Sequence, residues 1–117
     1  MRQQGELESQ VMDVIWSSEE PITSQQVLDS VNGAGNELAL TTILTVLSRL
    51  VDKGLIVRES SGGRNLKFAA VESRELHSAN LMLKLLDDSQ NPALTFAQFT
   101  SALSPKQLEA LRKSIEQ

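Results

Sequence analysis

Cysteine is absent from the sequence, and histidine occurs only once, at position 77. Without cysteine the chain can form no disulfide, no thiolate metal site and no cysteine nucleophile. Catalysis by His77 would need partner residues of a kind that the chain does not supply. Carboxylates occur in pairs, at Glu19 and Glu20 and at Asp87 and Asp88, but no glycine-rich phosphate loop or second histidine accompanies them. We therefore expect no enzyme, no metal and no cofactor.

Long hydrophobic runs are also missing. No stretch approaches the roughly 20 apolar residues that a membrane-spanning helix needs, and no secretion signal follows Met1. We expect a cytoplasmic protein that has no membrane partner. Aromatic residues make up only 3% of the chain, so its core must be built mainly from leucine, valine and isoleucine.

The net charge of −4 argues at first against binding to DNA. The charge is unevenly distributed, however. Residues 1–37 are strongly acidic, and only residues 38–70 carry more basic than acidic side chains. Because binding depends on the field at the docking face rather than on the total charge, residues 38–70 are the candidate nucleic-acid surface.

Hydrophobic residues recur at helical spacing in three stretches of the first half of the chain. The first helix is expected at 6–17. The second is expected after Thr23, whose side chain fits a capping box with Gln26. A third helix is expected at 41–53, and Gly54 follows it where a left-handed residue commonly ends a helix.

A β-hairpin is expected next. Two short β-type runs, "LIVRE" and "NLKFA", stand on either side of the turn "SSGGR". In the second run Leu66 and Phe68 alternate with Asn65 and Lys67. This alternation predicts that Leu66 and Phe68 are buried and that Lys67 faces solvent.

The chain becomes helical again after residue 70. Helices are expected at 73–86, at 93–102 and after Ser104, which combines a capping box with a following proline. The predicted fold class is mainly α with a small β-hairpin. The order of elements is that of a winged helix-turn-helix domain at 1–70 followed by a helical dimerisation domain at 71–117.

The outer face of the third helix is the first candidate functional surface. With the apolar side turned inward, that face presents Thr41, Thr42, Leu44, Thr45, Ser48 and Arg49. Hydroxyl groups suit phosphate contacts, methyl groups suit thymine, and arginine binds guanine or a phosphate. The alternative is an ordinary solvent-exposed face. Threonine is a weak helix former at such positions, however, which favours a function.

The hairpin is the second candidate surface. Arg64 in its turn and Lys67 in its second strand would contact DNA if the hairpin acts as a wing. Glycine turns are common, so the hairpin is convincing only together with the third helix and the local positive charge. Lys53 and Arg58 are interpreted as solvated charges or flanking contacts. The main alternative function is a winged helix that binds protein and has no specific affinity for DNA.

The tail holds more leucine and phenylalanine than short helices can bury among themselves. Surplus apolar surface of this kind is usually buried against a second copy of the chain. Folding back onto the winged helix is the alternative. The expected dimerisation residues are Leu76, Leu83, Leu86, Leu94, Phe96, Phe99, Leu103, Leu108, Leu111 and Ile115.

Three blocks of sequence resemble the penicillinase-repressor (BlaI/MecI-like) family of bacterial winged-helix repressors. They are "LESQVMDVIW", "TTILTVLSRLVDKGLI" and "LSPKQLEALRKSI". The resemblance implies a homodimer on a dyad-symmetric promoter operator, controlling β-lactam resistance or a related stress response. By position, Thr41, Thr42, Thr45 and Arg49 correspond to the family's recognition helix, and Arg64 corresponds to its wing. Many members carry a basic residue where this chain has Thr41 and Leu44.

The resemblance also bears on induction. Some family members are cleaved at an Asn-Phe bond in the tail, after a membrane sensor detects a β-lactam. Thr95 and Phe96 stand at that place here, without the asparagine. The resemblance therefore implies a regulatory protease as a candidate partner, with Thr95–Phe96 as the candidate cleavage site.

Overall fold

The computed structural model describes residues 4–60 and 66–116. The chain divides after Leu76 into two compact units, which we describe separately. The predicted functional boundary between residues 70 and 71 stays a prediction. Among the described residues, no helix is long and apolar enough to cross a membrane.

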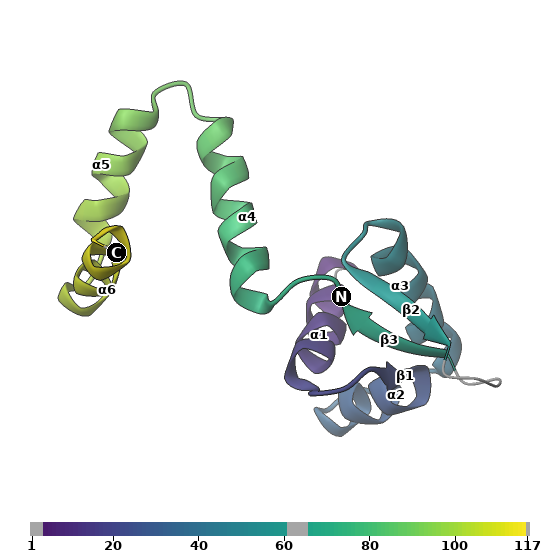
Figure 1. Ribbon diagram of the computed structural model, residues 1–117. Helices are drawn as coiled ribbons and strands as arrows, with labels where there is room; N and C mark the ends of the chain where they lie inside the picture. Colours follow the sequence, from purple (N-terminus) through teal and green to yellow (C-terminus); the bar gives the residue numbers. More distant parts are fainter. Residues whose placement is uncertain (1–3, 61–65, 117) are drawn as a thin grey trace. The chain divides into compact units, whose positions relative to one another are not determined.

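The first unit combines three helices with three short strands (Figure 1). In chain order its elements are α1 (Gln4–Ser17), β1 (Ile22–Thr23), α2 (Ser24–Gly33), α3 (Leu40–Asp52), β2 (Ile56–Ser60) and β3 (Leu66–Ala70). The strands form an antiparallel sheet in the order β1-β3-β2. This is the predicted winged helix, with the two-residue strand β1 added to the edge of the predicted hairpin.

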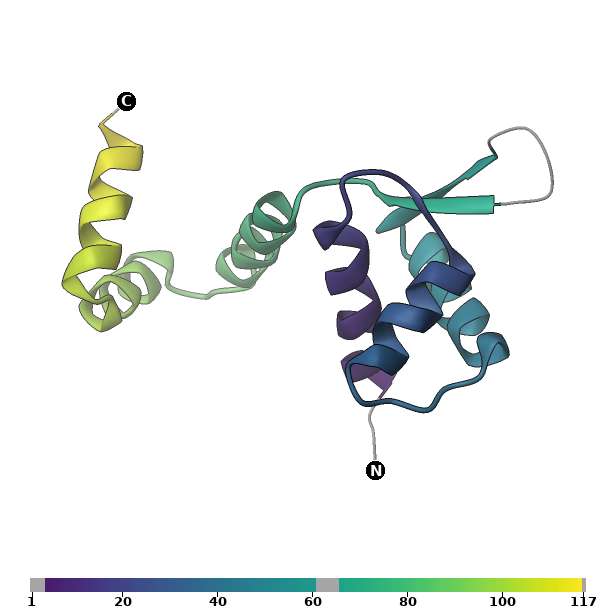
Figure 2. The ribbon, with the colours of Figure 1, turned by 90° about the horizontal axis from the view of Figure 1, so that it is seen from below.

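The core of this unit lies between the helices and one face of the sheet. Figure 2 shows α1, α2 and α3 on the same side of the strands. The buried hydrophobic side chains are Leu7, Val11, Met12, Ile15, Ile22, Val27, Val31, Ile43, Val46, Leu47, Leu50, Ile56 and Phe68. Most are leucine, valine or isoleucine, as the scarcity of aromatic residues predicts.

Local sequence signals determine where the helices begin and end. The Thr23 hydroxyl accepts a hydrogen bond from the backbone N–H of Gln26, and the Gln26 side chain accepts one from the Thr23 backbone N–H. This is the predicted capping box. Gly54 has a φ of 78°, which only glycine adopts readily, and it follows α3 as predicted.

One prediction about the sheet is wrong. Phe68 is buried, but Leu66 keeps 47% of its surface exposed. Alternation places both side chains on the same face of β3. Leu66 pairs with Ser60 at the end of the hairpin, however, whereas Phe68 lies between Ile22 and Arg58 in the middle of the sheet. The core covers only that middle part.

The second unit continues α4 (Arg74–Asp87), which begins in the first unit, and adds α5 (Pro92–Ala102) and α6 (Pro105–Ile115). Ser73 accepts a hydrogen bond from the Leu76 N–H at the start of α4. Ser104 forms the predicted capping box with Gln107 at the start of α6. None of the three helices has a fully buried side chain among its described residues.

Candidate DNA-binding surface

The connection before α3 is held by asparagine side chains. Asn32 donates to the Leu38 carbonyl at 3.1 Å and accepts from the Leu38 N–H at 2.8 Å. Asn36 is buried and donates to the carbonyl of Val31 at 2.8 Å and to Gln10 Oε1 at 3.0 Å. These bonds link α1, α2 and the connection that leads into α3. They therefore fix the direction in which α3 leaves the turn.

The inner face of α3 is fully anchored. Its buried residues Ile43, Val46, Leu47 and Leu50 each expose 2% of their surface or less. Because these four positions settle the rotation of the helix, the outer face follows from helical geometry. Thr41, Leu44, Thr45, Ser48 and Arg49 are exposed and Thr42 is half-buried. The structure thus brings together all six α3 residues that the sequence predicts for DNA binding, while their roles stay predictions.

The outer face combines apolar and polar groups. Leu44 exposes 42% of its surface to solvent, although it lies in the middle of a well-formed helix. The Thr45 hydroxyl donates to the Thr41 carbonyl at 3.0 Å, one turn back along α3. Since that bond uses the hydroxyl proton of Thr45, its hydroxyl can still accept a hydrogen bond and its methyl group can make apolar contacts.

Arg58 on β2 extends this face beyond the helix. Its Nη2 lies 3.4 Å from Ser48 Oγ on α3. The sequence alone predicts a solvated charge or flanking contact at Arg58 and not a site residue. The position of Arg58 follows from the pairing of β2 with β3. Arg58 lies opposite Phe68 and therefore on the face of the sheet that the helices cover.

Lys53 forms an ion pair within the domain that the sequence does not predict. Its Nζ lies 2.6 Å from Glu8 Oε1 on α1, and the Glu8 residue is only 8% exposed. The pair joins α1 to the residue that follows α3. The Lys53 side chain itself stays 54% exposed, so it is a solvated charge that also pairs with the nearly buried Glu8.

The predicted wing residues are less close to α3. Lys67 is half-buried and lies opposite Glu59 in the β2–β3 ladder. Alternation places Lys67 and Glu59 on the face of the sheet away from Arg58. The structure therefore does not group Lys67 with the outer face of α3. Arg64 lies outside the described residues.

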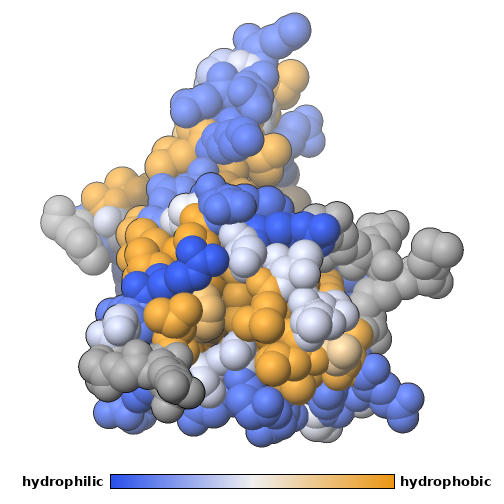
Figure 3. Space-filling view, turned by 90° about the vertical axis from the view of Figure 1, so that its right-hand side faces the viewer, coloured by the Kyte–Doolittle hydropathy of each residue, from blue (hydrophilic) through white to orange (hydrophobic). Residues whose placement is uncertain are grey.

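Hydrophobic and hydrophilic groups alternate on the side of the first unit where α3 lies. Figure 3 views the right-hand side of Figure 1, where α3 and the ends of β2 and β3 lie, and shows orange patches separated by blue and white ones. Such a mixture suits base edges and phosphates together. Among residues 4–60 and 66–116, no group of three or more histidine, cysteine or acidic side chains could hold a metal ion.

The tail leaves its apolar side chains largely uncovered. Seven of the ten predicted dimerisation residues are exposed: Leu76, Leu83, Leu94, Phe96, Phe99, Leu108 and Ile115. The remaining three, Leu86, Leu103 and Leu111, are half-buried. Leu81, Met82 and Leu85 on α4 are also exposed and were not among the predicted residues. The tail therefore has far more exposed apolar surface than the winged helix.

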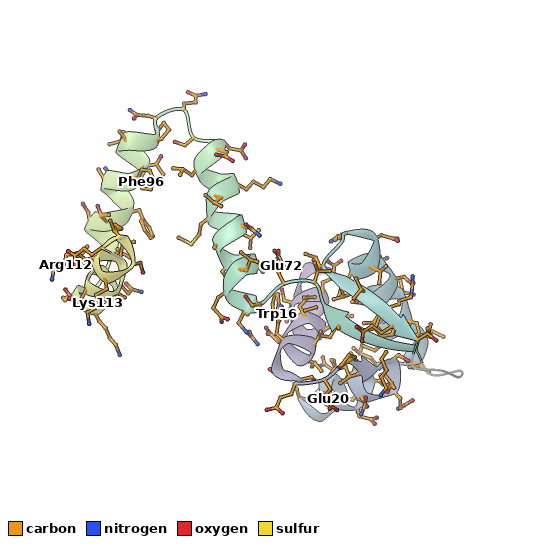
Figure 4. All side chains as sticks on the ribbon, in the orientation of Figure 1. Trp16, Glu20, Glu72, Phe96, Arg112 and Lys113 are labelled. Carbon is orange, nitrogen blue, oxygen red and sulfur yellow. The ribbon has the colours of Figure 1, made fainter. Side chains whose placement is uncertain are left out.

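The candidate cleavage site lies inside a helix. Thr95 and Phe96 belong to the first turns of α5, and Figure 4 labels Phe96 on that helix. The Thr95 N–H donates to the Asn91 carbonyl at 3.0 Å, and the hydroxyls of Thr95 and Ser89 lie 2.6 Å apart. A protease that binds its substrate as an extended chain would have to unwind this end of α5.

Comparisons with known proteins agree with this architecture. The sequence profile described as penicillinase repressor matches residues 4–117. Two proteins named transcriptional regulator BlaI, from two strains of Mycobacterium tuberculosis, are each 34% identical to this chain over 114 residues. The matched region covers 95% of this chain and 81% of each regulator.

Proposed function

Because the chain belongs to the penicillinase repressor family, and so is a DNA-binding transcriptional repressor and not an enzyme, we propose that it acts as a homodimer on a dyad-symmetric promoter operator. The observation that carries the proposal is the outer face of α3. Four buried residues fix this helix, and its opposite side presents methyl, hydroxyl and guanidinium groups to solvent.

The residues of this face divide into readers of bases and binders of phosphate. Leu44 and the Thr45 methyl group contact thymine methyl groups in the major groove. The Arg49 guanidinium donates two hydrogen bonds to the major-groove edge of a guanine. Thr41, Thr42 and Ser48 donate hydroxyl hydrogen bonds to phosphates or base edges.

Arg58 binds a backbone phosphate beside α3. Its guanidinium reaches Ser48 on the outer face of that helix, and it forms no ion pair with a carboxylate among the described residues. Arg64 contacts the backbone from the wing, whereas Lys67 lies on the opposite face of the sheet from Arg58 and is not part of this surface. Since this chain has threonine and leucine where many members have basic residues, apolar contacts contribute an unusually large share of its specificity.

A second copy of the chain covers the apolar side chains of the tail. Leucine and phenylalanine side chains of α4, α5 and α6 stay exposed in the single chain. Dimerisation links two winged helices, so that binding of the second half-site becomes intramolecular and the effective concentration rises. This compensates for the small number of basic residues in each winged helix.

Repression follows from occupancy of the promoter by the dimer. A dimer bound across a promoter blocks access of the transcription machinery, and the name of the family supports antibiotic resistance as the regulated response. In this proposal the repressor acts in the cytoplasm. Cleavage at Thr95–Phe96 would release it, because it separates α6 and most of α5 from the rest of the tail.

Footprinting on the promoter of its own gene, combined with sedimentation of the protein–DNA complex, tests this function. We expect a protected segment with dyad symmetry and two chains for each duplex. Protection without internal symmetry, or one chain for each duplex at saturation, would contradict the homodimeric arrangement.

A further inference from the structure

A cavity of about 300 Å³ lies in the first unit, where the end of α1, the loop before β1 and the segment after β3 meet. Its apolar walls come from Ile15, Trp16, Pro21, Ala70 and Val71. This volume is at the lower end of the range for small-molecule sites. All lining residues fall between positions 15 and 73, so the cavity belongs to the first unit alone.

The rest of the lining is mainly polar and consists of two serines, one alanine and three acidic residues. Glu19, Glu20 and Glu72 line it, and its lining includes no lysine, arginine or histidine. Figure 4 labels Trp16, Glu20 and Glu72 on the first unit. The indole Nε1 of Trp16 donates to the Glu72 carbonyl at 3.0 Å. This bond holds the aromatic wall in place beside the carboxylates.

The protein already places one of its own cations on this aromatic wall. The guanidinium carbon of Arg74 lies 5.2 Å from the centroid of the Trp16 ring. Asp13 pairs with the same guanidinium at 2.7 Å. A ring face that holds a cation at this distance is electrostatically favourable to positive charge. The aromatic ring and the carboxylates therefore favour the same sign of ligand.

We propose that this cavity binds a small organic cation, namely an amine with a compact apolar body. The ammonium group pairs with Glu19 and Glu20, and the body packs on Ile15, Trp16 and Ala70. An anion would meet three acidic residues in the lining, and the nearby Arg74 guanidinium is already paired with Asp13. The site uses none of the residues assigned to DNA binding or to the tail interface. A failed test of amine binding would therefore leave the proposed homodimer on its operator unaffected, and a failed test of operator binding would leave the amine site unaffected.

The chain carries its own reporter for this site, because Trp16 is its only tryptophan. Titration with 2-phenylethylamine at constant ionic strength should change the Trp16 fluorescence in a saturable way. The control ligand is 3-phenylpropionate, which keeps the phenyl group and reverses the charge. It should produce no saturable change.

Two double variants with equal charge change locate the binding site. Glu19→Gln with Glu20→Gln removes the two proposed ammonium partners, each of which contributes about 1.4- to 5-fold as an exposed pair, so affinity should fall several-fold. Glu6→Gln with Glu37→Gln changes two exposed carboxylates outside the lining and should leave affinity unchanged. Absence of saturation, an equal response to the anion, or equal weakening in both double variants would overturn the proposal.

Discussion

The most informative single substitution in the proposed DNA surface is Leu44→Ala. Full burial of a leucine side chain contributes about 1.5–3 kcal/mol. Leu44 is 42% exposed in the free protein, so a thymine contact has that fraction left to bury. The loss in operator binding should therefore be roughly 0.6–1.3 kcal/mol, or about 3- to 9-fold in affinity. The free energy of unfolding should fall modestly, because the part of Leu44 that is already covered in the free protein loses its contacts, and the higher helix propensity of alanine offsets only a little of this loss.

Fluorescence anisotropy with two operator duplexes isolates this contact. Replacing thymine by uracil removes the methyl group that Leu44 is proposed to touch. On thymine DNA the variant should bind more weakly than the original protein. On uracil DNA the two should bind alike. Val57→Ala is the matched control, because Val57 is 44% exposed but lies on the opposite face of the sheet from Arg58. A loss of equal size on both duplexes would refute the contact.

Three further predictions concern affinity, assembly and stability. Arg49→Ala should cost about 1–3 kcal/mol in specific binding if Arg49 reads a base edge. Replacing Phe99 and Leu111 by aspartate should give monomers in sedimentation and a sharp loss of operator affinity, because it places charges in the proposed tail interface. Lys53→Ala should lower the free energy of unfolding by roughly 1 kcal/mol in chemical denaturation, because the ion pair with Glu8 is more than half exposed at its lysine end.

Each of these predictions has an outcome that would contradict it. Equal losses on operator and random DNA would make Arg49 a phosphate contact. A double aspartate variant that sediments as a dimer would show that the interface lies elsewhere. Lys53→Ala with unchanged stability but weaker DNA binding would return Lys53 to the flanking role that the sequence suggested.

The sequence predicted the features that depend on local patterns. The spacing of Ile43, Leu47 and Leu50 fixed the inner face of α3, and therefore its outer face, because helical geometry leaves one rotation that buries all three. The capping boxes at Thr23 and Ser104 were found because each needs only four consecutive residues.

Features that depend on contacts between distant residues were missed. The ion pair between Lys53 and Glu8 joins residues 45 positions apart, and no local pattern predicts it. The contact between Arg58 and Ser48 depends on the register of β2 against β3. Strand β1 contains only two residues, too few to show an alternation. The exposure of Leu66 depends on where the helices stop covering the sheet.

Specific binding of the full-length protein to its own promoter tests the central claim most directly. Fluorescence anisotropy should compare that promoter with a random duplex, each at low and near-physiological salt. We expect tight binding to the promoter, weak binding to the random duplex, and a loss of affinity as salt rises because phosphate contacts release counterions. Equal and weak binding to both duplexes at either salt concentration would contradict the proposal that the outer face of α3 reads an operator in this promoter.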